Sequence, residues 1–376
     1  MVAYSYTSLG YLAQAKDANS TQVFWTPNSY DAEGNLTQAT SGNGIITNQT
    51  YDADTGFKTG IQAGVGNGVA NFIYTYDTLS NLTSRADVVQ GLSEAFTYDT
   101  MNRITEYAIT GGSTKTVTYD DLGNITSKSD VGTYTYPTAG SAGPHAVASI
   151  TPSGTGTTNT TFVYDANGNM TSGNGRTTTW NAFNKVATIT QGTKTVSFDY
   201  DSDHARVRQV TSTQITHYMF GVEKVIGTSG SIQWNEYISV DGMLIGQHYT
   251  NIAAGGGATT TTMRYFVTDH LGSVAVITDE AGAVVERLSY DAWGKRRFAT
   301  GADDPTGSIT SQTTKGFTGI QCGCLSLAYW SICQSNSSRT IPAEVISRAN
   351  QAAFEGPKSI NSSDDFRPSK HPRKSP

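Results

Sequence analysis

The sequence has 376 residues, of which 15% are charged, and a formal net charge of −6; it contains 39 Gly and 20 Tyr. This composition is typical of a turn-dense β-sheet, and it argues against a charged helical bundle or a disordered acidic chain. The negative charge without a basic stripe argues against a nucleic-acid partner, and no apolar run reaches membrane-spanning length.

The N-terminal segment, residues 1–6, has neither a basic nor an apolar signal-peptide region, so it is not predicted to be a secretory signal. It leads directly into a degenerate copy of the repeat described next, with Tyr6, Gly10 and Leu12 in the equivalent places. We therefore expect the chain to start inside a longer array of repeats.

A single cadence recurs down the chain: Tyr-Asp, two variable residues, Gly or Asn, one more residue, and an aliphatic residue. Tyrosines at positions 30, 51, 76, 98 and 119 are separated by 21, 25, 22 and 21 residues, and a period in this range indicates a repeat architecture. The residues of the predicted structural motif are Tyr30, Asp31, Gly34, Tyr76, Asp77, Tyr98, Asp99, Asn102, Tyr119, Asp120, Gly123, Tyr164, Asp165, Gly168, Tyr290, Asp291 and Gly294.

Each copy predicts a bulged β-hairpin. The Thr-rich, alternating residues before each Tyr indicate a strand, and the Asp can accept hydrogen bonds from backbone amides two residues on. The fourth residue after the aromatic should need a positive φ, which Gly tolerates best and which Asn102, Asn184 and His204 tolerate next best. Ser80 is the exception to this pattern, and Gly56 stands one residue late, as if its copy carries one extra residue.

One such hairpin cannot fold alone. Ordering about 21 residues costs roughly 30 kcal/mol, whereas burying one Tyr and a few aliphatic side chains returns roughly 10 kcal/mol. The copies must therefore pair edge to edge, which predicts an all-β fold: a spiral antiparallel β-hairpin repeat sheet. We expect a repeat array over residues 1–210, its continuation over 211–320, and a partly disordered tail over 321–376 with a short helix from Pro342 to Glu355.

No catalytic residue, cofactor site or metal site is predicted. Asp269, His270 and Ser273 are neighbours in one predicted turn, where their side chains point in different directions, so a catalytic triad is not expected. The segments 52–54 and 201–203 lack the ligand spacing of a calcium loop. Cys-Gly-Cys at 322–324, with one distant Cys and no nearby His, is a poor zinc pattern. Four Asn-x-Thr sequons follow from the repeat itself, and we interpret them as turn residues rather than glycosylation sites.

These motifs resemble the Rhs/YD-repeat family of bacterial toxin shells, which also includes the animal teneurins. The Tyr-Asp-x-x-Gly-Asn-Leu copies carry the resemblance, together with residues 265–295, which contain Asp-His-Leu-Gly-Ser and Tyr-Asp-Ala-Trp-Gly. The resemblance covers roughly residues 1–320, and it implies a hollow β-shell that encloses or presents a variable C-terminal domain. Two family segments expected next, Arg-x-Tyr-Asp-Pro and Asp-Pro-x-Gly-Leu, are absent, which suggests truncation before the self-cleaving core, by frameshift or recombination.

Three functions follow as hypotheses. The first is a non-enzymatic structural piece of such a shell, whose partners are a polypeptide cargo or the remainder of the shell. The second is a cell-surface carbohydrate-binding or adhesion module, in which aromatic and Asn/Asp-rich loops contact glycans. The third is an effector whose activity resides in the tail, although a tail of under 60 residues with little apolar content can hardly fold alone.

Overall fold

The computed structural model of the chain describes residues 1–138, 143–154, 159–304 and 307–319. Within these residues the fold is all-β: 27 strands form one antiparallel sheet, and two further strands form a separate hairpin. The predicted fold class, an antiparallel sheet of repeated hairpins, is confirmed. The predicted helix from Pro342 to Glu355 lies outside the described residues. No described helix combines the length and hydropathy needed to cross a membrane.

The strands of the first half are short and regular. They are β1 Val2–Tyr6, β2 Leu12–Asp17, β3 Val23–Tyr30, β4 Leu36–Ser41, β5 Ile46–Tyr51, β6 Lys58–Ala63, β7 Ala70–Tyr76, β8 Leu82–Asp87, β9 Leu92–Tyr98, β10 Ile104–Ile109, β11 Lys115–Tyr119, β12 Ile125–Lys128, β13 Gly132–Thr135, β14 Ser149–Pro152, β15 Thr160–Tyr164 and β16 Met170–Gly173, with the 3₁₀ turn η1 at Val65–Asn67.

The remaining strands include the longest of the sheet. They are β17 Arg176–Trp180, β18 Val186–Gln191, β19 Lys194–Tyr200, β20 Arg206–Val210, β21 Gln214–Met219, β22 Val222–Gly227, β23 Ile232–Val240, β24 Met243–Ile252, β25 Thr259–Thr268, β26 Val274–Thr278, β27 Val284–Arg287, β28 Ser289–Tyr290 and β29 Arg296–Arg297, with 3₁₀ turns η2 at Ala254–Gly256 and η3 at Phe317–Gly319.

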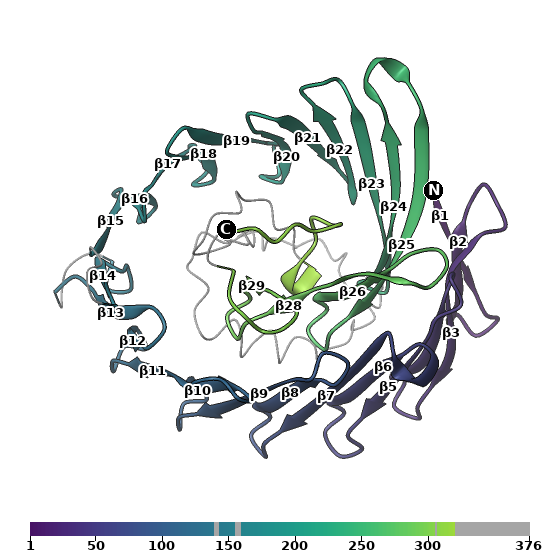
Figure 1. The fold of residues 1–376 in the computed structure, drawn as a ribbon, viewed down its shortest axis with the longest axis horizontal. Coiled ribbons are helices and arrows are strands. Elements are labelled where there is room, and N and C mark those ends of the chain that lie inside the picture. The colour runs from purple at the N-terminus through teal and green to yellow at the C-terminus, as the bar shows by residue number, and fades with distance from the viewer. Residues whose placement is uncertain (139–142, 155–158, 305–306, 320–376) are drawn as a thin grey trace, which may run out of the picture.

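Each strand pairs with its neighbour in sequence, so the sheet is a long meander of hairpins. The register shifts by a bulge at the repeat aromatics, as between Thr75 and Tyr76 and between Thr118 and Tyr119. Such a bulge increases the local twist and bends the strand. Repeated at hairpin after hairpin, the bends curl the sheet (Figure 1). The sheet continues without a break past residue 210, because β20 pairs with β21.

The curled sheet is a spiral whose end lies inside its beginning (Figure 1). We call β1–β22 the wall and residues 263–304 with 307–319 the inner layer. The overlap is held by contacts between residues far apart in sequence: the Tyr4 hydroxyl donates to the Ser239 carbonyl over 2.6 Å, and Asn43 Nδ2 donates to Thr278 Oγ1 over 2.9 Å. The spiral expected from the repeat is therefore present, and its innermost part is the C-terminal end of the described chain.

Two apolar cores fill the overlap. In the first, inward-facing residues of β5–β11 such as Phe72, Tyr74 and Phe96 pack against Val267 and Val276 of the inner layer. The second core joins β2–β4 to β23–β25. These side chains share one face of each strand, since alternate residues point to opposite faces. The spiral thus gains a two-layered region, which a single curled hairpin sheet does not provide.

Candidate functional site

The turn of each repeat is organised by its Asp. In the β7–β8 hairpin, Asp77 Oδ1 accepts hydrogen bonds from the backbone amides of Leu79 and Asn81, over 2.9 and 2.8 Å. The Ser80 amide donates to the Asp77 carbonyl over 3.0 Å and closes the bend. One carboxylate therefore satisfies two backbone donors that the reversal of the chain would leave unpaired.

The same arrangement recurs in the other copies. In each case the first carboxylate oxygen accepts from the amides two and four residues on: Asp99, Asp120, Asp165 and Asp291. The φ angle four residues after the aromatic is positive in each of these turns: 87° at Gly34, 73° at Ser80, 59° at Asn102, 85° at Gly123, 83° at Gly168 and 80° at Gly294. Ser80, an exception in sequence, takes the same backbone conformation as its glycine counterparts.

The asparagines of the four sequons belong to the turns. Asn35, Asn81, Asn124 and Asn169 each donate a side-chain N–H to the second carboxylate oxygen of their own turn Asp, over 2.9 to 3.0 Å. The bonds from Asn35 and Asn169 lower the pKa of Asp31 and Asp165. The amide nitrogen that glycosylation would use is thus already engaged within the repeat.

The repeat tyrosine has a second role that its packing does not reveal. Tyr98 donates its hydroxyl to the carbonyl of Leu82 over 2.8 Å, and Tyr119 donates to that of Ile104 over 2.8 Å. The acceptor is each time the aliphatic residue that ends the preceding copy. Other copies repeat the bond: Tyr51 to Leu36, Tyr136 to Ile125, Tyr200 to Val186 and, through an indole N–H, Trp180 to Met170. Each of these six aromatic side chains therefore links its own hairpin to the one before it.

The inner layer contains one copy of the same motif in a different environment. Tyr290 is buried and donates to the Val274 carbonyl over 3.2 Å, while Asp291 is also buried. Burial raises the pKa of Asp291, whereas the side-chain hydrogen bond from Asn35 lowers the pKa of the half-buried Asp31. A Cβ on Gly294 would lie within 3 Å of the Phe317 ring, so this glycine is needed for packing as well as for its φ.

A buried ion cluster joins this inner copy to the wall. Glu94 of β9 accepts from Arg85 of β8 over 2.8 Å and from two nitrogens of Arg297 of β29, over 3.2 and 2.9 Å. Arg85 also donates to the Tyr290 carbonyl over 2.7 Å. Burial alone would raise the pKa of Glu94, but the two arginines outweigh it and the pKa is lowered. The wall and the inner layer are therefore held in one register by charge as well as by apolar contact.

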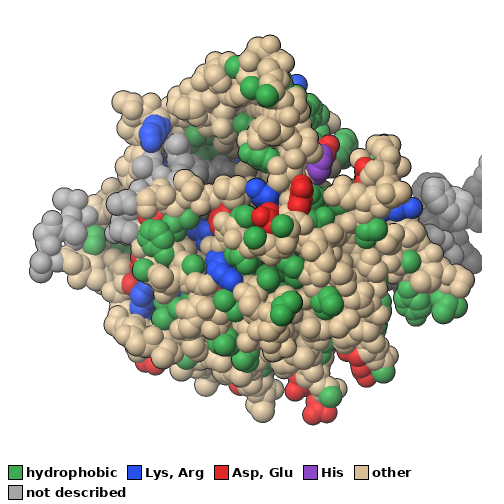
Figure 2. All heavy atoms as spheres, turned by 45° about the vertical axis from the view of Figure 1, so that its right-hand side comes forward, with side chains coloured by type: hydrophobic (Ala, Val, Ile, Leu, Met, Phe, Trp, Pro, Cys, Tyr) green, Lys and Arg blue, Asp and Glu red, His purple; other side chains and the backbone are tan. Residues whose placement is uncertain are grey.

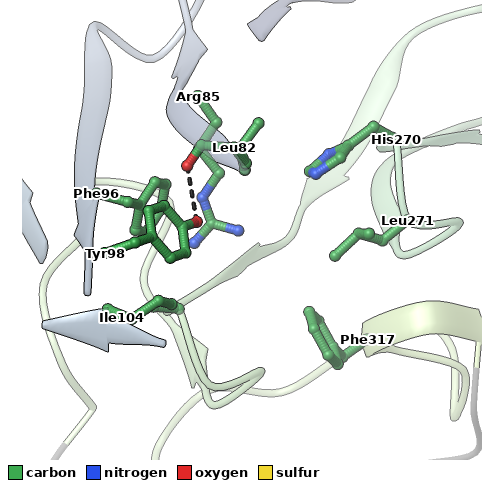
Figure 3. A pocket seen from close by; sticks show the side chains of 9 residues that line it. Leu82, Arg85, Phe96, Tyr98, Ile104, His270, Leu271 and Phe317 are labelled. Carbon is green, nitrogen blue, oxygen red and sulfur yellow. Dashed lines mark hydrogen bonds between the residues drawn. The ribbon is translucent and has the colours of Figure 1, made fainter. Parts of the chain in front are cut away.

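A small pocket lies beside this cluster, between β8–β10 and the inner layer (Figure 3). Its volume is about 20 Å³. Arg85 and His270 point into it, and the Tyr98–Leu82 hydrogen bond lies along its wall side. The remaining lining side chains are Phe96, Ile104, Leu271, Ala292 and Phe317.

His270 is the unusual residue of this pocket. Both ring nitrogens are shielded from solvent, and neither has a hydrogen-bond partner. The ring lies 4.2 Å from that of Tyr74, whose hydroxyl accepts from the His270 backbone amide over 3.3 Å. Burial, with the positive charges of Arg85 and Lys58, lowers the pKa of His270 to about 3. The imidazole is therefore neutral at physiological pH.

Asp269, His270 and Ser273 do not form the hydrogen-bonded chain of a triad, because neither ring nitrogen of His270 has a partner. Asp269 accepts from the amides of Leu271 and Ser273, as Asp77 and Asp99 do in their turns, and the Ser273 hydroxyl accepts from the Thr318 amide over 3.0 Å. The turn interpretation of these residues agrees with this geometry. Among the described residues, no three His, Cys, Asp or Glu side chains gather in a way that could hold a metal ion. The cysteines at 322–324 and 333 lie outside the described residues.

Reasoning from the sequence did not find Arg85, Glu94 and Arg297. A signal was present for one of them: Glu94 lies two residues before Phe96 and four before Tyr98, so alternation places its charge on the buried face of β9. A charge on that face requires a partner of opposite sign. The partner Arg297 is 203 residues away, and no local pattern identifies it.

No protein-family model matches the chain. Two curated relatives are 24% identical to it: tRNA nuclease WapA of Bacillus subtilis, over 329 residues, and tRNA3(Ser)-specific nuclease WapA of Bacillus spizizenii, over 331 residues. Each alignment covers 80% of this chain, and the chain spans only 12% of the length of either relative.

Solved structures share the fold. The crystal structure of TcdB2-TccC3-Cdc42 aligns with a TM-score of 0.65 and 16% identity, over 85% of this chain and 18% of that chain. The Photorhabdus luminescens Tc holotoxin pore aligns with a TM-score of 0.61 and 16% identity, over 88% of this chain and 18% of that chain. The chain thus has the β-shell fold of these toxin complexes and corresponds to part of their length.

Proposed function

We propose that this chain is a non-enzymatic segment of an Rhs/YD-repeat β-shell, whose role is to enclose a polypeptide and isolate it from its surroundings. The observation that carries the proposal is the spiral itself: hairpins fastened laterally by their tyrosines curve around an interior, and the inner layer ends inside it (Figure 1). The fold shared with the Tc toxin structures and the partial match to WapA support it.

The mechanism follows from topology. Lateral pairing of successive hairpins leaves no open strand edge between β1 and β27 in the described residues. A wall of this kind excludes other proteins, because each of its inner strands has a paired neighbour on both sides and offers no edge for strand addition. The face seen in Figure 2 shows scattered charges on a mostly uncharged surface.

A protease-access experiment on the full chain tests the enclosing role. A short protease site is inserted after Gly319, where the described chain ends inside the spiral, and in a second variant between Gly256 and Gly257, in the loop between β24 and β25. We expect the loop site to be cut at least about tenfold faster, because cleavage of the enclosed site requires opening. Equal rates in two folded variants would refute enclosure. Specific, saturable binding on a glycan array would favour the carbohydrate-binding alternative instead.

A further inference from the structure

The pocket between the wall and the inner layer has an excess of positive charge on one side. Arg85 and Arg297 share the single carboxylate of Glu94, so these three hydrogen-bonded side chains together carry two positive charges and one negative charge. Arg85 is the member of the cluster that lines the pocket. In a low-dielectric interior such an excess attracts a counter-charge much more strongly than it would in water.

Opposite Arg85, the pocket presents a hydrogen-bond donor with nothing to receive it. A neutral imidazole carries one N–H donor, and both ring nitrogens of His270 are buried and unpaired. Figure 3 shows the ring directed toward the side of the pocket where Arg85 lies. A buried donor without a hydrogen bond costs about 1–3 kcal/mol, and an acceptor in the pocket would remove this cost.

The size and lining of the pocket restrict what that acceptor can be. A volume of about 20 Å³ holds one particle of roughly the size of a water molecule. The other lining side chains are apolar except for Tyr98, whose hydroxyl already donates to the Leu82 carbonyl, so none of them offers a free donor to a larger polar ligand.

Two further carboxylates, those of Asp269 and Asp291, act on Arg85, but neither side chain lines the pocket. Asp269 directs its first carboxylate oxygen to the amides of Leu271 and Ser273, and burial raises its pKa. Asp291 is turned in the same way to the amides of Trp293 and Lys295, and burial raises its pKa as well.

We propose that this pocket is a binding site for a single small anion of chloride size, which accepts hydrogen bonds from the His270 ring N–H and the Arg85 guanidinium. Such an ion places a negative charge beside Arg85 inside the pocket and gives the His270 ring the hydrogen-bond acceptor that it lacks. Because the pocket is formed by the wall on one side and the inner layer on the other, the bound ion stabilises their contact.

Chloride dependence of the full chain tests the site. Melting temperature is measured in sodium chloride and in sodium gluconate at equal ionic strength, since gluconate is too large to enter. We expect chloride to raise the melting temperature of the wild-type chain in a saturable way, and to have no such effect on His270→Phe. Ala292→Leu, which fills the pocket without removing a polar group, should also lose the response. An equal response in the three chains, or none in the wild type, would overturn the proposal.

Bromide provides a direct readout. Crystals of the wild-type chain soaked in bromide should show an anomalous peak between Arg85 and His270, and crystals of Ala292→Leu should show none there. If the wild-type crystals show no anomalous peak in the pocket and only an ordered water there, the pocket is not an anion site.

Discussion

At the scale of single residues, the turn position four residues after each aromatic is set by backbone conformation. At Gly123, φ is 85°, and a Cβ would meet no atom closer than Arg103 Nη1 at 4.0 Å. The position therefore has space for a side chain. A residue with a Cβ is disfavoured there because its backbone is strained in the left-handed region. Ser80 shows that the conformation can be imposed on another residue type at a cost.

Gly123→Val should destabilise the protein by about 1–2 kcal/mol or more, because a β-branched residue is strained at this φ. Asp121→Val, which places the same side chain at an exposed position two residues earlier, is the matched control. The measurement is the free energy of unfolding in denaturant. Equal losses in the two variants would mean that the backbone conformation is not the cause.

The tyrosine hydroxyls offer a second test at this scale. Tyr98→Phe should cost about 1 kcal/mol, because the Leu82 carbonyl loses its donor while the ring still packs. Tyr6→Phe is the control, since this tyrosine is 62% exposed in the first hairpin and its change should have no measurable effect. The measurement is the free energy of unfolding in denaturant. If Tyr98→Phe leaves it unchanged, the repeat tyrosine acts through packing alone.

At the scale of elements, the inner layer and the wall are joined by a buried Arg–Glu–Arg cluster. Such clusters add little net stability compared with apolar replacements, but removing one member leaves uncompensated charge in the interior. We expect the cluster here to set the register of the two layers, because Arg297 on β29 of the inner layer bonds Glu94 on β9 of the wall.

Glu94→Gln should therefore destabilise the protein by about 3–5 kcal/mol, since two arginines then face each other without a carboxylate. Glu33→Gln, at an exposed turn, provides the control and should lie within about 0.5 kcal/mol of the wild type. Thermal unfolding of both variants checks the difference. If Glu94→Gln lost no more stability than Glu33→Gln, the cluster would not be what holds the inner layer against the wall.

His270 should make the free energy of unfolding depend on pH in a direction that follows from its pKa. Its pKa is lowered to about 3, so the unfolded chain takes up a proton below about pH 6.5 while the folded chain does not. The stability that neutral His270 contributes to the folded chain is fully present above pH 6.5 and is lost as the pH falls toward 3. Asp269 and Asp291, whose pKa values are raised, act in the opposite sense, so the wild-type curve alone mixes these effects.

Comparison with His270→Phe isolates the histidine. In chloride-free buffer, the stability of the variant relative to the wild type should grow by about 1.4 kcal/mol per pH unit below pH 6.5. Denaturant unfolding across pH 4 to 7 measures this difference. A difference independent of pH would show that His270 is accessible to protons in the folded chain.

At the scale of the whole molecule, lateral pairing protects every strand between β1 and β27, but β1 pairs only with β2 in the described residues. Its five residues, Val2–Tyr6, carry no charge and no proline, which are the usual devices that keep edge strands from pairing with other chains. The other end strand, β27, also pairs on one side only, but it carries Glu286 and Arg287. The β1 edge is therefore the more suited of the two to strand addition.

The isolated chain should self-associate through this edge, and Tyr6→Lys should reduce the association, because a charged residue on an edge strand disfavours pairing. Tyr11→Lys, at a similarly exposed position in the following turn, is the control and should leave association unchanged. Light scattering measures the oligomeric state. A monodisperse wild-type monomer would contradict the prediction.

The repeat unit can be predicted from local residues: the Tyr-Asp cadence predicts the hairpin, its bulge and the positive φ, because these depend on contacts within about seven residues. The cadence also predicts that hairpins must pair into one curling sheet, since one hairpin buries too little to fold. The folded chain was needed to learn which tyrosine donates to which carbonyl, that Glu94 bonds Arg297, and that the turn of His270 places its ring in a pocket. Those contacts depend on the accumulated curvature of the sheet, which brings residues about 200 positions apart into one layer and which no local pattern encodes.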